Sequence, residues 1–354
     1  MRLYYFYFKG KSFLFLGLVL WCFSTCQDPQ RPLAIVHPDY FVPPLIPADN
    51  PTTAAGVALG RQLFFDPILS ANHNISCASC HQPGMAFTDG RARSIGFAGR
   101  VGKRSAPSLL NVGFYQKGLF WDGRSPSLEE QALHPVTDPL EMAADWSIIV
   151  ARLRVHPYYP QAFQRAFGTP EPDSMRIAKA LAQFQRTLVS SDAKYDRVLR
   201  GEAAFTPQEQ RGYNIFFDAD PENTPMAECN HCHSDPLFTN LAYENNGLEY
   251  APELTEFSDL GRGKISGQLA ENGTFKVPTL RNIALTAPYM HDGRFTSLDE
   301  VVDHYNQGGV YAPNRDPQVR PLGLNEQDKA DLIAFLYTLT DSTALFNPAY
   351  AGPN

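Results

Sequence analysis

The chain has 354 residues, of which 44% are hydrophobic, and this length is enough for two domains that each bury their own core. Its formal net charge is −7, and the charges are spread along the chain, which argues against a nucleic-acid partner. Twenty-nine prolines and 25 glycines predict short helices joined by many loops.

The N-terminal region resembles an export signal followed by a linker. Residues 1–26 combine a basic start with an apolar run at residues 13–23, which is too short for a membrane span of about 20 residues. Cys26 could be the lipidated first residue of a lipoprotein, although the preceding residues match such a site poorly. Residues 27–50 contain six prolines and are predicted to form a tether.

One short pattern, Cys-x-x-Cys-His, occurs twice: CASCH at residues 77–81 and CNHCH at residues 229–233. It is the attachment site of a c-type haem, in which the two thiols bond the porphyrin and the His reaches the iron. A zinc site or a redox dithiol would also use Cys-x-x-Cys, but neither explains the His in both copies. The predicted haem-binding residues are Cys77, Cys80, His81, Cys229, Cys232 and His233.

The surroundings of the two motifs are also repeated. GRQLFFD at residues 60–66 and GYNIFFD at residues 212–218 each begin 17 residues before the first Cys. Downstream, FWDGR and SLEE at residues 120–130 match MHDGR and SLDE at residues 290–300, and each Ser with its Glu predicts a capping box at a helix start. Two haem domains, at residues 51–200 and 201–354, are the simplest explanation. We expect corresponding helices near 175–189 and 325–340.

The two copies differ where a second iron ligand would lie. Tyr305 falls at the i+7 position of an apolar helix face that starts at Leu298, whereas the corresponding residue of the first copy is Pro135. Tyr305 could equally be an ordinary core tyrosine. If it binds iron, one haem is saturated and the other keeps an open position.

Two polar residues of the first copy lie close to Pro135 in the sequence. Glu141 could take a proton from bound peroxide and return it to the distal oxygen, and Gln131 could donate a hydrogen bond to the bound oxygen. Alternatively, Glu141 is a solvated carboxylate in a loop, and Gln131 is a surface residue of a helix.

The chain resembles the bacterial di-haem cytochrome c peroxidase family, and within it the MauG-like branch. The resemblance runs from about residue 55 to residue 340 and rests on FDP, FWDGR, EQA, EM and PTLRN at residues 65–67, 120–124, 130–132, 141–142 and 278–282. It implies that His81 holds the peroxidatic haem and His233 the electron-transfer haem. It also implies that Trp121, otherwise a core aromatic, relays electrons, and that Gln131 and Glu141 line the peroxide pocket.

Two positions favour the MauG-like branch. Other members carry Met as the sixth ligand of the second haem, whereas MauG-like members carry Tyr, as this chain does at Tyr305. An anionic phenolate ligand should lower the reduction potential of the haem iron, whereas a Met ligand raises it. Met290 is a rival ligand, but its counterpart Phe120 suggests packing. Many members hold a blocking His in the loop at residues 90–104. This chain has Phe97 there, so we expect an open first haem without reductive activation.

The resemblance further implies a calcium ion bound through the backbone carbonyls of Thr286 and Pro288. A family Asn that joins them is replaced by Ser105 in this chain. Oxygen ligands and water would still suit calcium.

The sequence thus predicts an all-α protein of two cytochrome-c-like domains, exported to the periplasm, with two covalent haem c groups. The predicted function is reduction of hydrogen peroxide, with electrons from a small c-type cytochrome or a copper protein. Oxidation of residues of a protein substrate, as in MauG-type enzymes, is the alternative within the family. Outside it, a pure di-haem electron carrier and a haem-based sensor remain as alternatives.

Overall fold

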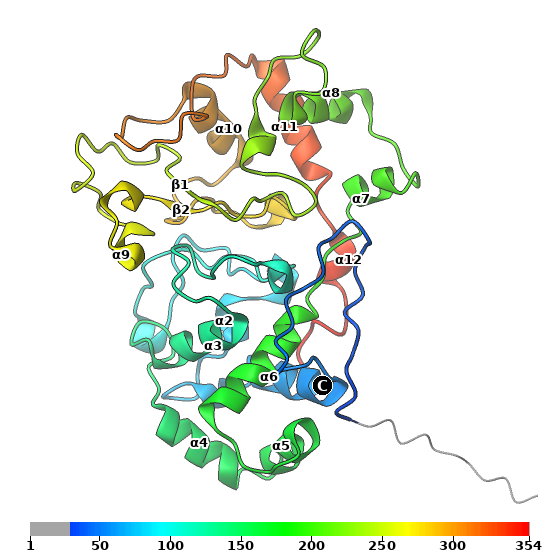
Figure 1. The fold of residues 1–354 in the computed structure, drawn as a ribbon, viewed down its shortest axis with the longest axis vertical. Coiled ribbons are helices and arrows are strands. Elements are labelled where there is room, and N and C mark those ends of the chain that lie inside the picture. The colour runs from blue at the N-terminus through cyan, green and yellow to red at the C-terminus, as the bar shows by residue number, and fades with distance from the viewer. Residues whose placement is uncertain (1–28, 354) are drawn as a thin grey trace, which may run out of the picture.

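The computed structural model describes residues 29–353 as two lobes stacked along the long axis of the molecule (Figure 1). The predicted export signal at residues 1–26, with Cys26, lies outside these residues. Helices dominate both lobes, and the only sheet among residues 29–353 is a single pair of two-residue strands, which confirms the predicted fold class. None of the described helices is long and apolar enough to cross a membrane.

The first lobe is built on a buried pair of helices, α1 and α6. Each begins at a side chain that accepts a hydrogen bond from the first turn, Thr53 for α1 and Asp173 for α6, which satisfies an otherwise unpaired N–H group. The helix expected near 175–189 is therefore α6. The elements of this lobe are α1 (Ala54–Phe65), α2 (Cys77–Cys80), α3 (Leu128–Thr137), α4 (Trp146–Val155), α5 (Tyr159–Phe167), α6 (Ser174–Arg186) and the 3-10 turns η1 (Pro67–Leu69), η2 (Pro83–Met85), η3 (Phe97–Gly99) and η4 (Val112–Phe114).

The second lobe repeats this arrangement around α8 and α11. The predicted capping box at Ser297 is present as a reciprocal pair, Thr206 forms another at the start of α8, and Asn325 caps α11, the helix expected near 325–340. At α3 only one half of the predicted capping box forms, because the Ser127 hydroxyl accepts from the backbone N–H of Glu130 without the reciprocal bond. The elements are α7 (Lys194–Leu199), α8 (Pro207–Phe217), η5 (Cys229–His231), β1 (Tyr243–Glu244), α9 (Gly263–Ser266), η6 (Leu269–Glu271), β2 (Phe275–Lys276), η7 (Ile283–Leu285), α10 (Leu298–Gln307) and α11 (Glu326–Tyr337). The last helix, α12 (Ser342–Leu345), packs on the first lobe.

The repeated glycine before each haem motif lies where the two helices of a pair cross. A Cβ atom on Gly60 would collide with the backbone carbonyl of Ala180 in α6. A Cβ atom on Gly212 would collide in the same way with the carbonyl of Asp331 in α11. The close approach of each helix pair therefore requires glycine at the start of both repeats.

An asparagine at the corresponding position of each repeat forms hydrogen bonds that link the two lobes. Asn111 and Asn282 both have positive φ, and their backbone N–H groups donate to Leu188 and Leu339, just after α6 and α11 (2.7 and 2.9 Å). The Asn282 amide also donates to the Ser190 hydroxyl at 2.9 Å, and Ser190 N–H donates to the Asn111 side chain at 2.8 Å. The corresponding turns of the two repeats thus meet at one buried junction.

The segment predicted as a tether is packed onto the protein. Phe41 is buried, and the Arg281 guanidinium of the second lobe lies over its ring at 4.9 Å. The Tyr40 hydroxyl donates to Asp196 at 2.8 Å, and Asp196 in turn forms a buried, two-pronged ion pair with Arg281 (2.8 and 2.9 Å). Residues 29–50 are therefore a strap across both lobes. The prolines favour an extended path but do not reveal that Phe41 has a docking place.

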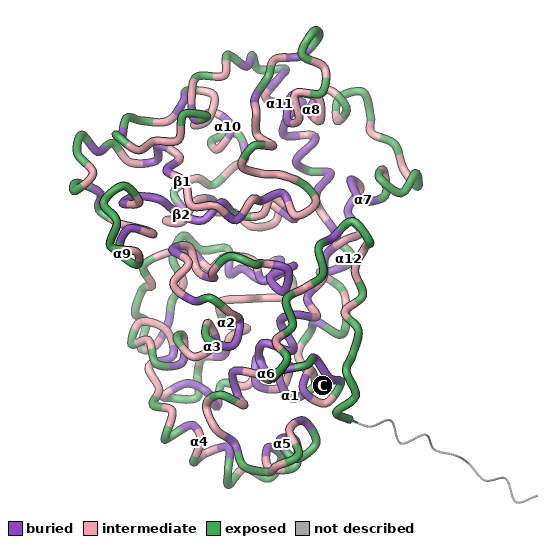
Figure 2. Tube along the Cα trace, in the orientation of Figure 1, coloured by how far each residue is buried: buried purple, intermediate pink, exposed green. Residues whose placement is uncertain are grey.

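The C-terminal residues return to the first lobe. Ala344 and Tyr350 belong to the hydrophobic core that includes α1 and α6, and the Tyr350 hydroxyl donates to the carbonyl of Val189 at 3.0 Å. The predicted second domain therefore shares its last residues with the core of the first lobe. Figure 2 shows that buried positions lie along α6, α11 and β2, whereas exposed positions lie on the outer loops.

A shared cavity carrying two haem-attachment motifs

One large cavity, of about 1240 Å³, extends from the first lobe into the second and is lined by side chains of both repeats. Both Cys-x-x-Cys-His motifs open onto it. Among the predicted site residues that line it are Cys77, Cys80, His81, Trp121, Gln131, Glu141, Cys229, Cys232, His233, Tyr305, Thr286 and Pro288. The fold therefore brings all the predicted site residues to one internal space.

The first motif lies on α2, with His81 at the end of that short helix. The His81 Nδ1 atom is 2.9 Å from the carbonyl oxygen of Phe87, so this nitrogen donates and leaves Nε2 to bind a metal. Burial lowers the pKa of His81, which keeps the ring neutral as an iron ligand must be. The thiols of Cys77 and Cys80 are unpaired, and burial raises their pKa values to about 12 and 11.

The second motif repeats this geometry from the turn η5. The His233 Nδ1 atom is 3.1 Å from the carbonyl oxygens of Phe238 and Pro278, and burial lowers the pKa of His233 to about 4. The thiols of Cys229 and Cys232 are likewise unpaired. Within residues 29–353 no three His, Cys, Asp or Glu side chains are grouped to hold a metal ion. Free thiol pairs, oriented imidazoles and a large cavity fit two covalent haem groups.

The first pocket contains Pro135 at the place where the second repeat has Tyr305, and Pro135 lines the cavity within α3. Phe97 does not line the cavity, whereas its neighbours Ser94 and Gly96 do. The Phe97 ring lies beneath the Arg100 guanidinium at 5.7 Å instead. Neither residue therefore offers a ligating atom to this pocket.

Glu141 is held at the edge of the first pocket by its backbone. Its N–H donates to Asp138 at 3.0 Å, and its carbonyl accepts from Phe97 at 2.7 Å. Burial of the carboxyl, reinforced by the charge of Asp138, raises the pKa of Glu141 to about 7, while Arg124 opposes the shift. A carboxyl with this pKa can both accept and return a proton near neutral pH.

The second pocket contains both rival ligands. The Asn246 side-chain nitrogen lies 3.3 Å from the Tyr305 hydroxyl oxygen and 3.4 Å from the Met290 sulfur. Burial raises the pKa of Tyr305 to about 12, and the hydrogen bond from Asn246 opposes the rise. Both Tyr305 and Met290 line the cavity, so the ligand assignment stays a prediction.

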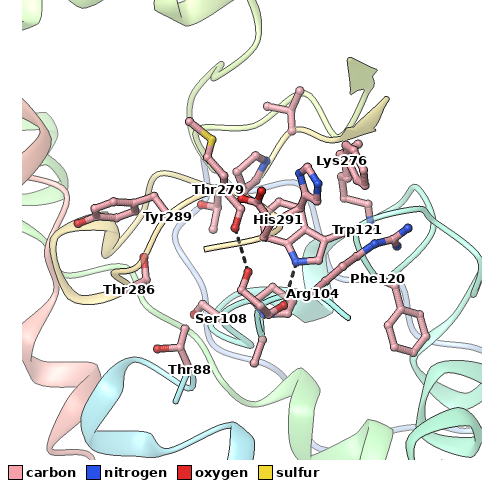
Figure 3. Close-up of a pocket in the computed structure, with 18 of the residues that line it drawn as sticks. Thr88, Arg104, Ser108, Phe120, Trp121, Lys276, Thr279, Thr286, Tyr289 and His291 are labelled. Atoms are coloured by element: carbon pink, nitrogen blue, oxygen red, sulfur yellow. Dashed lines mark hydrogen bonds between the residues drawn. The ribbon is translucent and has the colours of Figure 1, made fainter. Parts of the chain in front are cut away.

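Trp121 lies on the first-lobe side of the boundary between the lobes, and Figure 3 shows it beside His291 of the second lobe. The indole N–H donates to the carbonyl of Ser105 at 2.9 Å, and the ring centroids of Trp121 and His291 are 6.4 Å apart. His291 stacks on Phe275 with centroids 3.6 Å apart. Trp121 and His291 occupy the same position in the two repeats, so the duplicated turns face each other across the boundary.

Calcium binding through the carbonyls of Thr286 and Pro288 stays a prediction, and the side chains around them are engaged in other hydrogen bonds. The Ser105 hydroxyl donates to the carbonyl of Met290 at 3.0 Å, and the Thr286 hydroxyl donates to Ile283 at 3.2 Å. The carbonyls of Thr286 and Pro288 are the protein ligands of the expected set, and calcium takes six to eight oxygen ligands, so water would have to complete the site. Ser105 instead joins the two lobes directly.

Sequence reasoning missed three residues of this region. Asn246 contacts both rival ligands, and His291 contacts Trp121. Arg104 forms ion pairs with Asp122 and Asp259 at 2.6 and 2.7 Å. For His291 a signal existed, because it is the repeat counterpart of Trp121. Asn246 and Arg104 lie in loops whose contacts depend on the tertiary structure.

The helical lobes and the two attachment motifs on one cavity define a di-haem c-type protein. The family model described as di-haem cytochrome c peroxidase matches residues 54–204. The methylamine utilization protein MauG of Methylorubrum extorquens is 39% identical over 322 residues, which cover 89% of this chain and 87% of that protein. The cytochrome c551 peroxidase of Nitrosomonas europaea is 37% identical over 296 residues, covering 83% of each chain.

A solved structure agrees with these sequence relatives. A MauG-like protein associated with microbial copper homeostasis superimposes with a TM-score of 0.81 at 37% identity, covering 91% of this chain and 99% of that one. The chain therefore belongs to the di-haem cytochrome c peroxidase family. Membership implies two haem c groups and makes the protein a peroxide-dependent oxidoreductase.

Proposed function

We propose that the protein reduces hydrogen peroxide in the first pocket and passes electrons through Trp121 from a second haem held by His233 and Tyr305. The observation that carries this proposal is the buried carboxyl of Glu141, with its pKa raised to about 7, in a pocket where Pro135 replaces a ligand. When bound, the haem irons supply the redox chemistry. The residues around them supply binding, orientation and proton transfer.

Glu141 and Gln131 are the residues that handle the substrate. The Glu141 carboxylate takes a proton from one oxygen of hydrogen peroxide and returns it to the other oxygen as the O–O bond breaks, and this second oxygen departs as water. Two electrons from the donor and two further protons then convert the first oxygen to a second water. Gln131 projects from α3 into the same cavity, where its amide can orient the peroxide.

The distribution of iron ligands can be tested on the resting ferric protein. We expect an EPR spectrum with one high-spin signal, from the haem held by His81, beside one low-spin signal from the haem held by His233. Two low-spin signals would mean that both irons are six-coordinate, and the proposal would then give way to the electron-carrier alternative.

Trp121 is positioned to act as the relay. Its indole is fixed by the bond to Ser105, and its backbone carbonyl accepts from Lys276 of β2 at 2.8 Å. We expect Trp121→Phe to slow electron exchange between the haems by at least about tenfold while peroxide binding changes little. Stopped-flow absorption at both haems measures the two steps separately. Equal loss of both would indicate a packing role.

Oxidation of a protein substrate is the second candidate function. Tyr305, at the place where other members carry Met, favours it, and so do the relatives named MauG and MauG-like. Steady-state turnover of peroxide with a reduced c-type cytochrome or copper protein separates the candidates. Fast turnover supports the peroxidase, whereas slow turnover with a stable oxidised protein supports the protein-modifying enzyme.

We further propose that the mature protein works in the periplasm. Covalent haem attachment and the predicted signal at residues 1–26 both support export, and lipidation at Cys26 would hold the protein at a membrane surface. Mass spectrometry of the mature N-terminus distinguishes a lipidated Cys26 from simple cleavage. No step of the proposed reaction uses calcium.

A further inference from the structure

We propose that Asn246 is a positioning residue that donates a hydrogen bond to the iron-binding oxygen of Tyr305 and thereby raises the reduction potential of the second haem. The inference deepens the proposed function and rests on Tyr305 as the ligand of that haem. It concerns a residue in a loop outside both haem motifs and outside the duplicated segments.

The orientation of the Asn246 amide follows from its two neighbours. Its nitrogen is 3.3 Å from the Tyr305 oxygen and 3.4 Å from the Met290 sulfur. A thioether sulfur accepts hydrogen bonds and cannot donate, so the NH₂ end of the amide faces both groups. An iron-bound phenolate carries no proton. Only a hydrogen-bond donor, such as this N–H group, can then bond to it.

The backbone of Asn246 is fixed from two sides. The His304 Nε2 atom, on the residue next to Tyr305 in α10, donates to the Asn246 carbonyl at 2.9 Å. On the other side, the Asn245 side chain accepts from Gly247 N–H at 2.9 Å, and the Gly247 carbonyl accepts from Val310 at 2.8 Å. The same helix thus carries the proposed ligand and holds the residue that bonds to it, so the donor and acceptor keep their relative positions.

The direction of the effect follows from charge. A hydrogen bond to a coordinated phenolate stabilises its negative charge on the oxygen and weakens its donation to iron. Ferric iron depends on that donation more than ferrous iron does. Asn246 therefore shifts the second haem toward the ferrous form, against the strong preference for ferric iron that a free phenolate would impose.

The test is redox titration of the holoprotein with two variants. Asn246→Leu removes the N–H donors at similar side-chain size. We expect it to favour the ferric form of the second haem about tenfold, which lowers its potential by about 59 mV for one electron. Asn246→Asp keeps the side-chain shape but replaces the donors with oxygen. It should shift the potential in the same direction, which keeps the test decisive if the Leu variant fails to fold.

Asn314→Leu is the matched control. The Asn314 side-chain NH₂ donates to the carbonyls of Ala270 and Asn272, and its oxygen accepts from the Asn245 side chain at 2.8 Å. Asn314 therefore supports the same loop without a bond to Tyr305. It should lower thermal stability and leave the potential of the second haem unchanged. An unchanged or raised potential in both Asn246 variants would overturn the inference. If Tyr305→Phe leaves the second-haem spectrum as in the wild type, the ligand assignment of the proposed function has failed instead.

Discussion

Glu141→Gln is expected to slow the reaction with hydrogen peroxide by about 10²- to 10⁴-fold, the range for loss of a general acid–base group. Gln has nearly the same size as Glu but cannot accept and return a proton. Both haems should stay attached, because attachment uses other residues of the two motifs. Stopped-flow absorption after mixing with peroxide measures the rate, and the resting absorption spectrum measures haem content.

The pH dependence of the same rate gives an independent check on Glu141. The carboxyl must be ionised to take the first proton, and burial raises its pKa to about 7. The wild-type rate should therefore increase as the pH rises through about 7, and the variant should lose this increase. Glu130→Gln, the same change at an exposed position of α3, should behave as the wild type. An unchanged rate in Glu141→Gln would remove this residue from the mechanism.

Tyr305→Phe is expected to convert the second haem from a six-coordinate to a five-coordinate species, because the substitution removes only the oxygen donor from the pocket. In the EPR spectrum of the ferric protein, the low-spin signal of this haem should be replaced by a high-spin one. The effect should be near complete, because no fraction of the variant retains a phenolic oxygen. The first haem should keep its own signal.

Tyr289→Phe provides the matched control for this experiment. Tyr289 also lines the cavity, but its hydroxyl donates to the carbonyl of Ile283 at 3.1 Å. Its loss should leave both haem spectra unchanged. If Tyr305→Phe keeps a low-spin second haem, Met290 is the ligand in that variant. The single variant Met290→Leu then shows whether Met290 is also the ligand in the wild type, because it changes the second-haem spectrum only in that case.

The asymmetry between the two pockets explains why these effects are expected to be large and local. Each repeat presents the same Cys-x-x-Cys-His motif and the same helix pair to the cavity. The pockets differ in single side chains, Pro135 in one and Tyr305 in the other. Substituting such a side chain changes the chemistry of one iron while the shared scaffold stays intact.

Much of the fold followed from the sequence because the relevant signals are local. The caps at Thr206 and Ser297 and the apolar face of α6 each involve residues within one or two helical turns. The duplication placed the haem motifs in equivalent surroundings without any knowledge of distances. The same comparison identified Pro135 and Tyr305 as the positions where the copies differ.

What the sequence could not supply were contacts between segments far apart in the chain. The strap at residues 29–50 was predicted as a tether, because nothing local shows that Phe41 packs under Arg281. Likewise, the return of Tyr350 to the first core depends on a hydrogen bond with Val189, 161 residues earlier. Such contacts form only once both partners have been brought together.

The sequence by itself determined the two haem-attachment motifs, the helical duplication and the residue types at the positions where the two pockets differ, because such motifs and helix periodicity are encoded within short stretches. The tertiary structure decided the environment of those residues. It buried Glu141 enough to raise its pKa, set Trp121 against His291, and brought Asn246 to Tyr305 across 59 residues. Burial, ring contacts and hydrogen bonds between distant segments depend on how the lobes pack, and no local pattern specifies them.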